Sequence, residues 1–395
     1  MLKPLLAAML VLSVLSLAGM AGAQPTEETS MTGNEAFTFD FYAQIKADQG
    51  NLFFSPHSIL SAFWLAYLGA DGDTAAQMAE ALHLPTDRDN AALPDIGASA
   101  GEDFVLRSAN ALWAQETYPW RPDYVAQLEA LGAPIRLVDY LAAPEAVRQQ
   151  INQWVEETTE DKIQDLIPEG AIDQRTRLTI ANAVYFKATW LNQFLEALTQ
   201  DAPFTLLDGS SVTVPMMSMS EGVSLKVFQG DGFVAVALPY VGAADMLILL
   251  PDAGQFESFE SALTAQQYRD ILTAMQPTNA QVSMPRFTFE TFLSLGTPLE
   301  ALGMSAAFDP DQADFGRMYD RGSSGENLYI TAALHKAFVD VNEQGTEAAA
   351  ATGVVFGALS APMPGLMIRV DRPFLFAIRE TQTDTILFMG RVVNP

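Results

Sequence analysis

Residues 342–352 read Asn342-Glu343-Gln344-Gly345-Thr346-Glu347-Ala348-Ala349-Ala350-Ala351-Thr352, and their local preferences contradict the strand that precedes them. Alanine has the highest intrinsic helix propensity, so residues 347–351 favour a helix or a solvated loop. The segment nevertheless continues from the apolar, strand-like run 337–341. Read with a period of two, the even positions from 346 to 356 are uncharged, whereas Glu347 falls on the opposite face. One face can therefore enter a sheet, which indicates a segment that switches between loop and strand.

The N-terminus has the pattern of a secretory signal peptide. Lys3 gives a basic start, residues 5–17 are largely apolar, and Ala21-Gly22-Ala23 is a small-residue ending. The apolar run is shorter than the ~20 residues that span a bilayer. We therefore expect a signal peptide over 1–23, a flexible tail over 24–33, and a protein secreted to the cell envelope or the exterior.

The composition argues against several classes of function. The chain contains no cysteine, so it has no disulfide framework and no thiolate site, and export without disulfides suits a bacterial envelope or exterior. Its formal charge of −27 repels nucleic acid and anionic lipid, so we expect neither nucleic acid nor membrane as a partner. The three histidines, His57, His83 and His335, lack the spacing of a helical metal site. We expect no metal and no other cofactor.

One literal enzyme motif occurs, Gly97-Ala98-Ser99-Ala100-Gly101, which resembles the nucleophile elbow of a hydrolase. Such an elbow requires an apolar strand before it and a helix after it. Here Pro94-Asp95-Ile96 precedes the motif and Glu102-Asp103 follows it, which is typical of a loop of small residues. We therefore expect no catalytic residues; the hydrolase alternative predicts ester turnover that is lost in Ser99→Ala.

Helical patterns dominate the first half of the chain and strand patterns the second half. Helices are predicted at 34–47, 55–68, 73–82, 122–131, 144–166 and 256–275. Strands are predicted at 105–113, 177–186, 212–219, 223–228, 233–239, 245–250, 280–290, 329–341, 367–369, 374–379 and 385–392. No repeat or linker divides the chain, so residues 34–395 are interpreted as one α+β domain with more than one sheet.

Several separated segments carry a family resemblance, in the order 51–59 (Asn-Leu-Phe-Phe-Ser-Pro-His-Ser-Ile), 151–155 (Ile-Asn-Gln-Trp-Val), 182–187 (Asn-Ala-Val-Tyr-Phe-Lys), 285–287 (Pro-Arg-Phe), 334–337 (Leu-His-Lys-Ala), 372–374 (Arg-Pro-Phe) and 388–395 (Phe-Met-Gly-Arg-Val-Val-Asn-Pro). Together with residues 342–352, this ordered set resembles the serpins, a family of serine protease inhibitors. Asp161 departs from the family, which commonly has glycine there. The resemblance covers 34–395 and implies three β-sheets, about eight to nine helices, and an exposed reactive-centre loop over about 343–365.

The resemblance also assigns candidate site residues. It places a polar cluster beneath the main sheet, called the shutter, at Ser55, Ser58, Asn182 and His335. It places the point where the sheet opens, called the breach, at Trp190, Arg286 and Glu343. The hinge from which the loop leaves its strand maps to Glu343, Gly345, Thr346, Glu347, Ala348, Ala349, Ala350 and Ala351.

The resemblance implies that a serine protease attacks the loop and becomes trapped as a covalent acyl complex with a monomeric inhibitor. Counting as the family's loops count from Gly345, the attacked bond is Leu359-Ser360; Phe356 and Met363 are the alternatives to Leu359. No Arg or Lys lies between Glu343 and Leu366, which indicates chymotrypsin-, elastase- or subtilisin-like targets. The competing interpretation is a non-inhibitory serpin with a binding, storage or chaperone role. Such relatives often place a bulky or charged residue where this chain has Thr346.

Overall fold

The chain folds into two β-sheets that are covered by helices. The computed structural model describes residues 28–47, 50–88, 104–324, 327–346 and 365–395. Its helices are α1 (Glu28–Ile45), α2 (Pro56–Gly69), α3 (Gly72–Ala81), α4 (Pro122–Ala130), α5 (Pro144–Thr158), α6 (Phe256–Ala262), α7 (Ala265–Ala274), α8 (Gly296–Ala301) and α9 (Arg321–Ser324). Its strands are β1 (Leu52–Phe54), β2 (Phe104–Gln115), β3 (Arg136–Val138), β4 (Leu178–Thr189), β5 (Gln200–Thr205), β6 (Ser211–Ser218), β7 (Val223–Gly230), β8 (Phe233–Pro239), β9 (Ala244–Pro251), β10 (Gln276–Pro285), β11 (Phe287–Ser294), β12 (Ala332–Val341), β13 (Gly345–Thr346), β14 (Leu366–Arg369), β15 (Phe374–Glu380) and β16 (Ile386–Val392).

The larger sheet has ten strands in the order β1-β16-β15-β9-β8-β7-β10-β6-β5, with β14 beside β10. Three sheets were expected, and hydrogen bonding among the described residues joins them into two. The reason is β10, whose first half pairs with β7, whose last residues pair with β6, and whose centre pairs with β14. One long strand thereby connects what would otherwise be separate sheets. The predicted α+β class is confirmed.

The smaller sheet has six strands in the order β11-β12-β13-β4-β2-β3. Strands β12 and β4 run parallel and pair directly from Ala332 opposite Thr179 to Phe338 opposite Tyr185. Beyond this stretch β13 lies between them and is antiparallel to both. The sheet therefore accepts an additional strand at one end.

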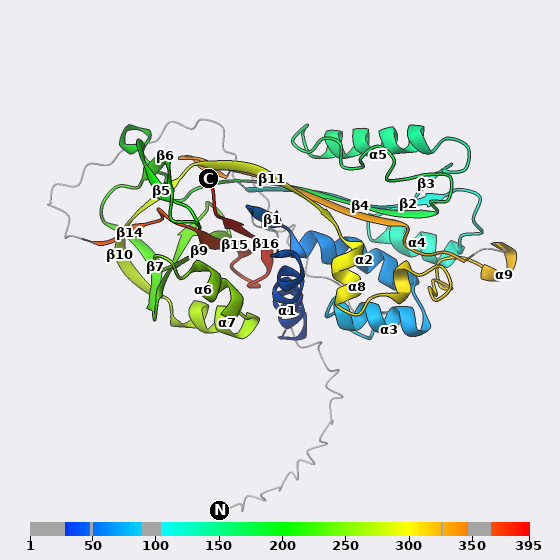
Figure 1. The fold of residues 1–395 in the computed structure, drawn as a ribbon. Coiled ribbons are helices and arrows are strands. Elements are labelled where there is room, and N and C mark those ends of the chain that lie inside the picture. Colours follow the sequence, from blue (N-terminus) through cyan, green and yellow to red (C-terminus); the bar gives the residue numbers. More distant parts are fainter. Residues whose placement is uncertain (1–27, 48–49, 89–103, 325–326, 347–364) are drawn as a thin grey trace, which may run out of the picture.

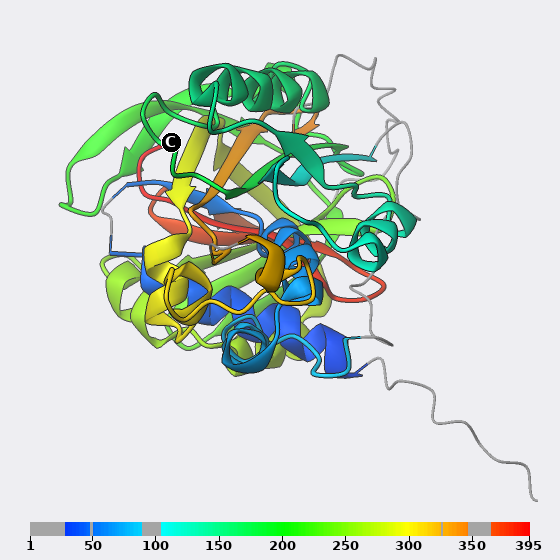
Figure 2. The ribbon, with the colours of Figure 1, turned by 90° about the vertical axis from the view of Figure 1, so that its right-hand side faces the viewer.

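Helices cover both faces of this smaller sheet. Helix α5 buries Val147, Ile151 and Val155 in a cluster with Ala181 and Ala183 of β4. Helix α2 lies on the opposite face and is buried along nearly its whole length. Figures 1 and 2 show α5 outside the sheet and α2 and α3 on its other side. The six-stranded sheet is therefore a middle layer between α5 and α2.

The sequence explains how α2 begins. The Ser55 side chain accepts a hydrogen bond from the Ser58 N–H at 3.0 Å, and Pro56 occupies the first turn, where no intrahelical donor is needed.

Within the described ranges, no helix combines the length and the apolar character needed to cross a bilayer.

Two predicted helices have different boundaries in the structure. Helix α5 ends at Thr158, although the pattern predicted helix to residue 166, because Glu160 and Asp161 adopt φ values of +54° and +60°. This left-handed conformation favours glycine and ends a helix. The helix predicted over 256–275 is divided into α6 and α7, because Thr264 caps α7 in a reciprocal arrangement with Gln267.

Two further segments differ from prediction. Helix α1 begins at Glu28, so residues 28–33, expected to belong to a flexible tail, are helical. The strand predicted over 280–290 is interrupted at Arg286: β10 belongs to the ten-stranded sheet and β11 to the six-stranded sheet. The break places Arg286 where the two sheets meet.

Candidate functional site

The chain reverses direction at the end of β12 and returns as β13. Asn342 controls the turn, because its Oδ1 accepts hydrogen bonds from the N–H groups of Gln344 and Gly345 at 3.0 and 3.3 Å. The Asn342 N–H donates to the Gly345 carbonyl at 2.9 Å. Thr346 then pairs with Val341 of β12 on one side and Ala188 of β4 on the other. Gly345 and Thr346 of the expected hinge therefore already lie in the sheet.

Glycine is required at position 345 because two backbones approach closely there. A Cβ atom at Gly345 would lie 2.0 Å from the carbonyl oxygen of Ala188, a distance that no side chain could occupy. The next residue, Thr346, is fully buried. The Thr346 and Tyr240 hydroxyl groups form a hydrogen bond at 2.7 Å, so the polar group that enters the sheet has a partner.

Trp190 connects this hydrogen bond to the turn. Its ring stacks on Tyr240 with centroids 4.2 Å apart and planes inclined by 9°. Its indole N–H donates to the carbonyl of Asn342 at 3.0 Å, and its backbone N–H donates to the carbonyl of Gln344 at 2.9 Å. The tryptophan expected at the breach therefore contacts the hairpin directly.

Arg286 and Glu343 form a bidentate ion pair at the same end of the sheet. The Arg286 Nε donates to Glu343 Oε2 at 2.7 Å, and its second nitrogen donates to Oε1 at 2.6 Å. The Thr199 hydroxyl donates to the same carboxylate at 2.5 Å. Burial alone would raise the pKa of Glu343, but the hydrogen bonds from Arg286 and Thr199 outweigh it, so its pKa is lowered. The carboxylate is thus charged near neutral pH.

The four residues expected at the shutter form one buried network beneath the β12–β4 pair. His335 and Asn182 are register partners across the two strands, and their side chains are hydrogen bonded through His335 Nδ1 and Asn182 Oδ1. The Asn182 amide donates to the Ser58 hydroxyl and the Ser58 carbonyl, both at 2.8 Å. Ser55 donates from its backbone N–H to His335 Nε2 at 3.2 Å and from its hydroxyl to the carbonyl of Leu387 at 2.6 Å.

The histidine in this network is neutral. Burial lowers the pKa of His335 to about 3. The neutral ring donates from Nδ1–H to Asn182 and accepts at Nε2 from Ser55, which satisfies both ring nitrogens. The network thus ties β4 and β12 to the start of α2 without a buried charge.

The sequence analysis missed four residues of this region, namely Ser108, Asn110, Thr199 and Tyr240. Asn110 of β2 accepts from the Ser58 hydroxyl at 3.1 Å and also from the Asn182 amide. Ser108 lies 3.0 Å from the Ser58 hydroxyl oxygen. A sequence signal existed for this pair, because Ser108 and Asn110 interrupt an alternating face that also holds Leu106 and Leu112. No local signal marks Thr199 or Tyr240.

Other candidate residues lie outside the described residues. These are the rest of the hinge from Glu347 to Ala351, the expected reactive bond Leu359-Ser360, the alternatives Phe356 and Met363, and Ser99 of the hydrolase motif. In the part of the chain that the structure describes, no group of three or more His, Asp or Glu side chains could hold a metal ion.

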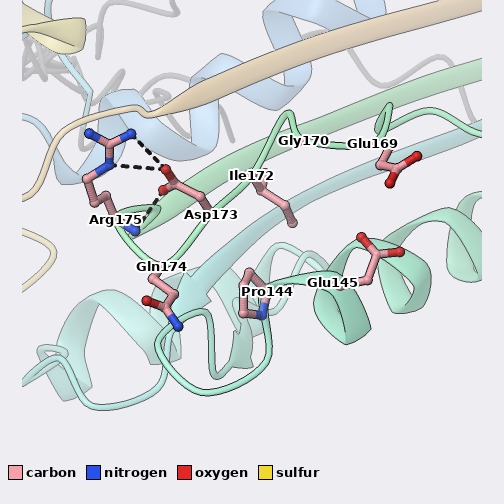
Figure 3. Close-up of a pocket in the computed structure, with 8 residues that line it drawn as sticks. All are labelled: Pro144, Glu145, Glu169, Gly170, Ile172, Asp173, Gln174 and Arg175. Atoms are coloured by element: carbon pink, nitrogen blue, oxygen red, sulfur yellow. Dashed lines mark hydrogen bonds and ion pairs between the residues drawn. The ribbon is translucent and has the colours of Figure 1, made fainter.

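A separate hollow of about 810 Å³ lies beside the start of α5 and the loop at 169–175 (Figure 3). Three of its four charged side chains have ionic partners: Arg175 pairs with Asp173 at 2.9 Å, and Glu145 pairs with Arg148 at 2.8 Å, which leaves Glu169 as the fourth. The hollow is open and lacks a convergent set of free polar groups. We therefore place the candidate functional site at the hinge and shutter.

Comparison with known proteins agrees with this geometry. A family model described as "Serpin (serine protease inhibitor)" matches residues 32–395. The chain belongs to the serpin family. The family resemblance noted in the sequence is confirmed. The expectation of a bacterial type is not confirmed, because the similar proteins include both archaeal and mammalian serpins.

Similar serpins match over nearly their whole length. An uncharacterised serpin-like protein of Thermococcus kodakarensis is 39% identical over 93% of this chain and 86% of its own. The leukocyte elastase inhibitor of Sus scrofa is 36% identical over 93% of this chain and 100% of its own. Among solved structures, uncleaved ovalbumin superposes with a TM-score of 0.83 at 26% identity, covering 93% of this chain and 100% of its own. The serpin fold is therefore shown for this chain.

Proposed function

We propose that this serpin inhibits chymotrypsin-, elastase- or subtilisin-like serine proteases irreversibly, by loop cleavage and strand insertion. The observation that carries the proposal is the position of β13, which is hydrogen bonded between β4 and β12 and antiparallel to both. Residues 348–351 are all alanine, and the alternation places Glu347 on the opposite face, so none of these side chains is too large for the same gap. The similarity of the whole chain to the leukocyte elastase inhibitor supports a protease target.

In this mechanism the protease supplies the catalytic groups and the serpin supplies the strand. The protease serine attacks the carbonyl of Leu359, an ester forms, and the amine of Ser360 leaves. The freed segment then extends β13 between β12 and β4. Seven register pairs, from Ala332–Thr179 to Phe338–Tyr185, must exchange their direct hydrogen bonds for bonds to the new strand.

The shutter lies on the path of this extension. His335 and Asn182 hold each other across the two strands that part, so their hydrogen bond must break as the new strand passes. Each residue keeps a second partner, Ser55 for His335 and Ser58 for Asn182. Breaking the bond therefore leaves neither side chain wholly unpaired, which lowers the barrier to opening.

The test is incubation of the protein, without residues 1–23, with chymotrypsin, an elastase, a subtilisin and trypsin. We expect a covalent complex that survives denaturing electrophoresis with at least one of the first three proteases. Cleavage of the loop without a stable complex would support the non-inhibitory alternative, in which the serpin binds or stores another molecule. A monomer in solution and export directed by residues 1–23 belong to the same proposal, and size-exclusion chromatography and N-terminal sequencing of exported material test them.

A further inference from the structure

An apolar pocket of about 300 Å³ opens on the ten-stranded sheet, between the hairpin β7–β8 and the helices α6 and α7. Figure 1 shows α6 and α7 below β9 and beside β7. The apolar lining residues are mainly Phe228, Phe233, Phe259, Leu263, Ile271 and Ala274. Its volume is at the lower end of the range found for small-molecule sites.

Three phenylalanine rings form one wall of the pocket. The Phe233 ring lies between the other two, with its centroid 5.9 Å from that of Phe228 and 4.8 Å from that of Phe259. All three side chains are half-buried, whereas Phe256, in the first turn of α6, is buried in the core. These rings therefore pack against the core on one side and line the pocket on the other.

The wall is held in place by backbone geometry. A Cβ atom at Gly230 would lie 2.2 Å from the Phe233 ring, so only glycine lets this ring pack over the end of β7. On the other side, the reciprocal cap between Thr264 and Gln267 fixes the start of α7. The pocket is thus formed before any ligand arrives, which reduces the entropy lost on binding.

The polar rim of the pocket selects the charge of a ligand. Asp270 lines the pocket, and its Oδ1 accepts from the Gln266 amide at 2.8 Å, while Oδ2 has no hydrogen-bond partner within the described ranges. Gln267 uses its Oε1 in the cap of α7, which leaves Asp270 as the charged group at the rim. The chain's net charge of −27 adds a field of the same sign. An anion is disfavoured here, and a cation is favoured by both the local and the global charge.

We propose that this pocket binds a small organic cation with an aromatic body. The aromatic body stacks against the phenylalanine wall, where burial of apolar surface and ring contacts stabilise it. The cationic group lies at the rim beside Asp270, where it remains partly hydrated. This binding site is distinct from the hinge and does not depend on protease inhibition.

The probe for this site is auramine O, a cationic diaryl dye that becomes fluorescent when it is held rigidly. Titration into the full chain should give saturable binding with a Kd on the order of 10⁻⁵ M. Ala262 lines the pocket and is exposed, so Ala262→Trp fills the pocket without disturbing the core and should abolish this binding. The matched control is Ser261→Trp, since Ser261 is exposed on the same helix but does not line the pocket.

A second pair of variants tests the role of charge. Asp270→Asn should weaken auramine O binding by roughly threefold, as expected for a partly exposed ion pair. Glu257→Gln removes the same charge from an exposed position of α6 outside the pocket and should leave Kd unchanged. Absence of saturable binding, equal affinity in Ala262→Trp and wild type, or equal weakening by both charge variants would each overturn the proposal.

Discussion

The hydroxyl groups of Tyr240 and Thr346 lie 2.7 Å apart in the interior of the protein, and this hydrogen bond joins the hinge to a residue that follows β8. Tyr240 is in turn stacked on Trp190, which donates to the carbonyl of Asn342. The buried Thr346 hydroxyl therefore has a polar partner within the sheet. Gly345 and Thr346 already form strand β13 between β4 and β12, which is the starting point of the strand insertion proposed above.

Tyr240→Phe should loosen the hinge while preserving the ring stack. The substitution removes one hydrogen bond and leaves the Thr346 hydroxyl buried without a partner, which costs about 1–2 kcal/mol in the inserted state. We expect hydrogen exchange at the Thr346 amide to accelerate by roughly tenfold. Tyr329→Phe, near the opposite end of β12, is the control and should leave this exchange unchanged. Equal exchange in wild type and Tyr240→Phe would show that the hydroxyl pair does not hold the hinge.

Thr346→Arg should convert the inhibitor into a substrate. Thr346 is fully buried between β4 and β12, so an arginine there either buries an unpaired charge, at a cost of several kcal/mol, or expels β13 from the sheet. Cleavage at Leu359-Ser360 should continue, because the reactive bond is unchanged, but deacylation should outrun insertion. The stoichiometry of inhibition with a chymotrypsin-like protease should rise to several serpin molecules per protease.

Two controls accompany this variant. Thr346→Val keeps the shape and should inhibit nearly as well as wild type, and Glu347→Arg should be tolerated because the alternation places Glu347 on the opposite face. Wild-type protein should also gain thermal stability when its loop is cleaved. An inhibitor that shows no such gain, or a Thr346→Arg variant with the wild-type stoichiometry, contradicts the insertion mechanism.

Glu343→Lys should promote polymers in which the loop of one molecule enters the sheet of the next. The lysine would lie beside Arg286 in a position where the wild-type carboxylate is almost fully buried, so it replaces a bidentate ion pair with like charges. Mild heating followed by native electrophoresis measures the outcome. Glu343→Gln removes the charge but keeps the shape, and it should polymerise less than Glu343→Lys. A Glu343→Lys variant that stays monomeric with unchanged inhibition would count against a restraining role for the pair.

The ion pair also predicts how acid affects the hinge. The pKa of Glu343 is lower in the folded protein than its ordinary value of 4.5. Its contribution to stability is therefore present above pH 4.5 and is lost as the pH falls through the lower, folded pKa. Polymerisation of the wild-type protein should accelerate in this acidic window, and the acceleration should be smaller in Glu343→Gln, which has no carboxylate to protonate.

Some parts of the site could be predicted from the sequence, either from the family resemblance or from local cues. The family resemblance assigns Arg286 and Glu343 to the breach, and His335 and Asn182 to the shutter, although these residues lie far apart in the sequence. The α2 cap at Ser55 and Pro56 follows from helix-terminus chemistry alone. Only this cap requires no knowledge of how distant strands are arranged.

Other parts depend on tertiary structure and left no local signal. Strand β13 has two residues, too few for any periodicity, and it exists only because β4 and β12 diverge around it. Tyr240 follows the predicted strand 233–239, and nothing nearby in sequence indicates that its hydroxyl meets residue 346. The joining of the expected sheets through β10 likewise depends on which strands flank it.

Leu359→Arg should move inhibition from chymotrypsin-like toward trypsin-like proteases. The residue before the cleaved bond fills the primary pocket of the protease, and a change from a leucine to an arginine exchanges an apolar contact for an ionic one. We expect the ratio of the two inhibition rates to change by at least 100-fold. Mass spectrometry of the released C-terminal peptide should find Ser360 at its start. A peptide that begins after Phe356 or Met363 would reassign the reactive bond.

His335→Gln should change how stability depends on pH. The folded pKa of His335 is about 3, below its ordinary value of 6.5, so between these values the unfolded chain binds the additional proton. In the wild type this residue contributes stability that is present above pH 6.5 and lost as the pH falls, by roughly 1.4 kcal/mol per pH unit. Glutamine cannot be protonated, but its amide can both donate and accept in the same network.

The measurement is the difference in unfolding free energy between His335→Gln and wild type, taken at pH 7 and pH 5 in urea. The variant should be less stable at pH 7, because its amide cannot reproduce the ring geometry that satisfies both Asn182 and Ser55. The deficit should shrink by about 2 kcal/mol at pH 5. Only the wild type contains an imidazole that stays neutral in the folded protein and is protonated in the unfolded chain, so only the wild type loses unfolding free energy there. Glu35, whose pKa burial raises to about 7, contributes an opposite slope in the same range, and it cancels because both proteins contain it. A deficit that is the same at both pH values would mean that folding does not lower the pKa of His335, and a neutral ring in the shutter at pH 5 would then be wrong.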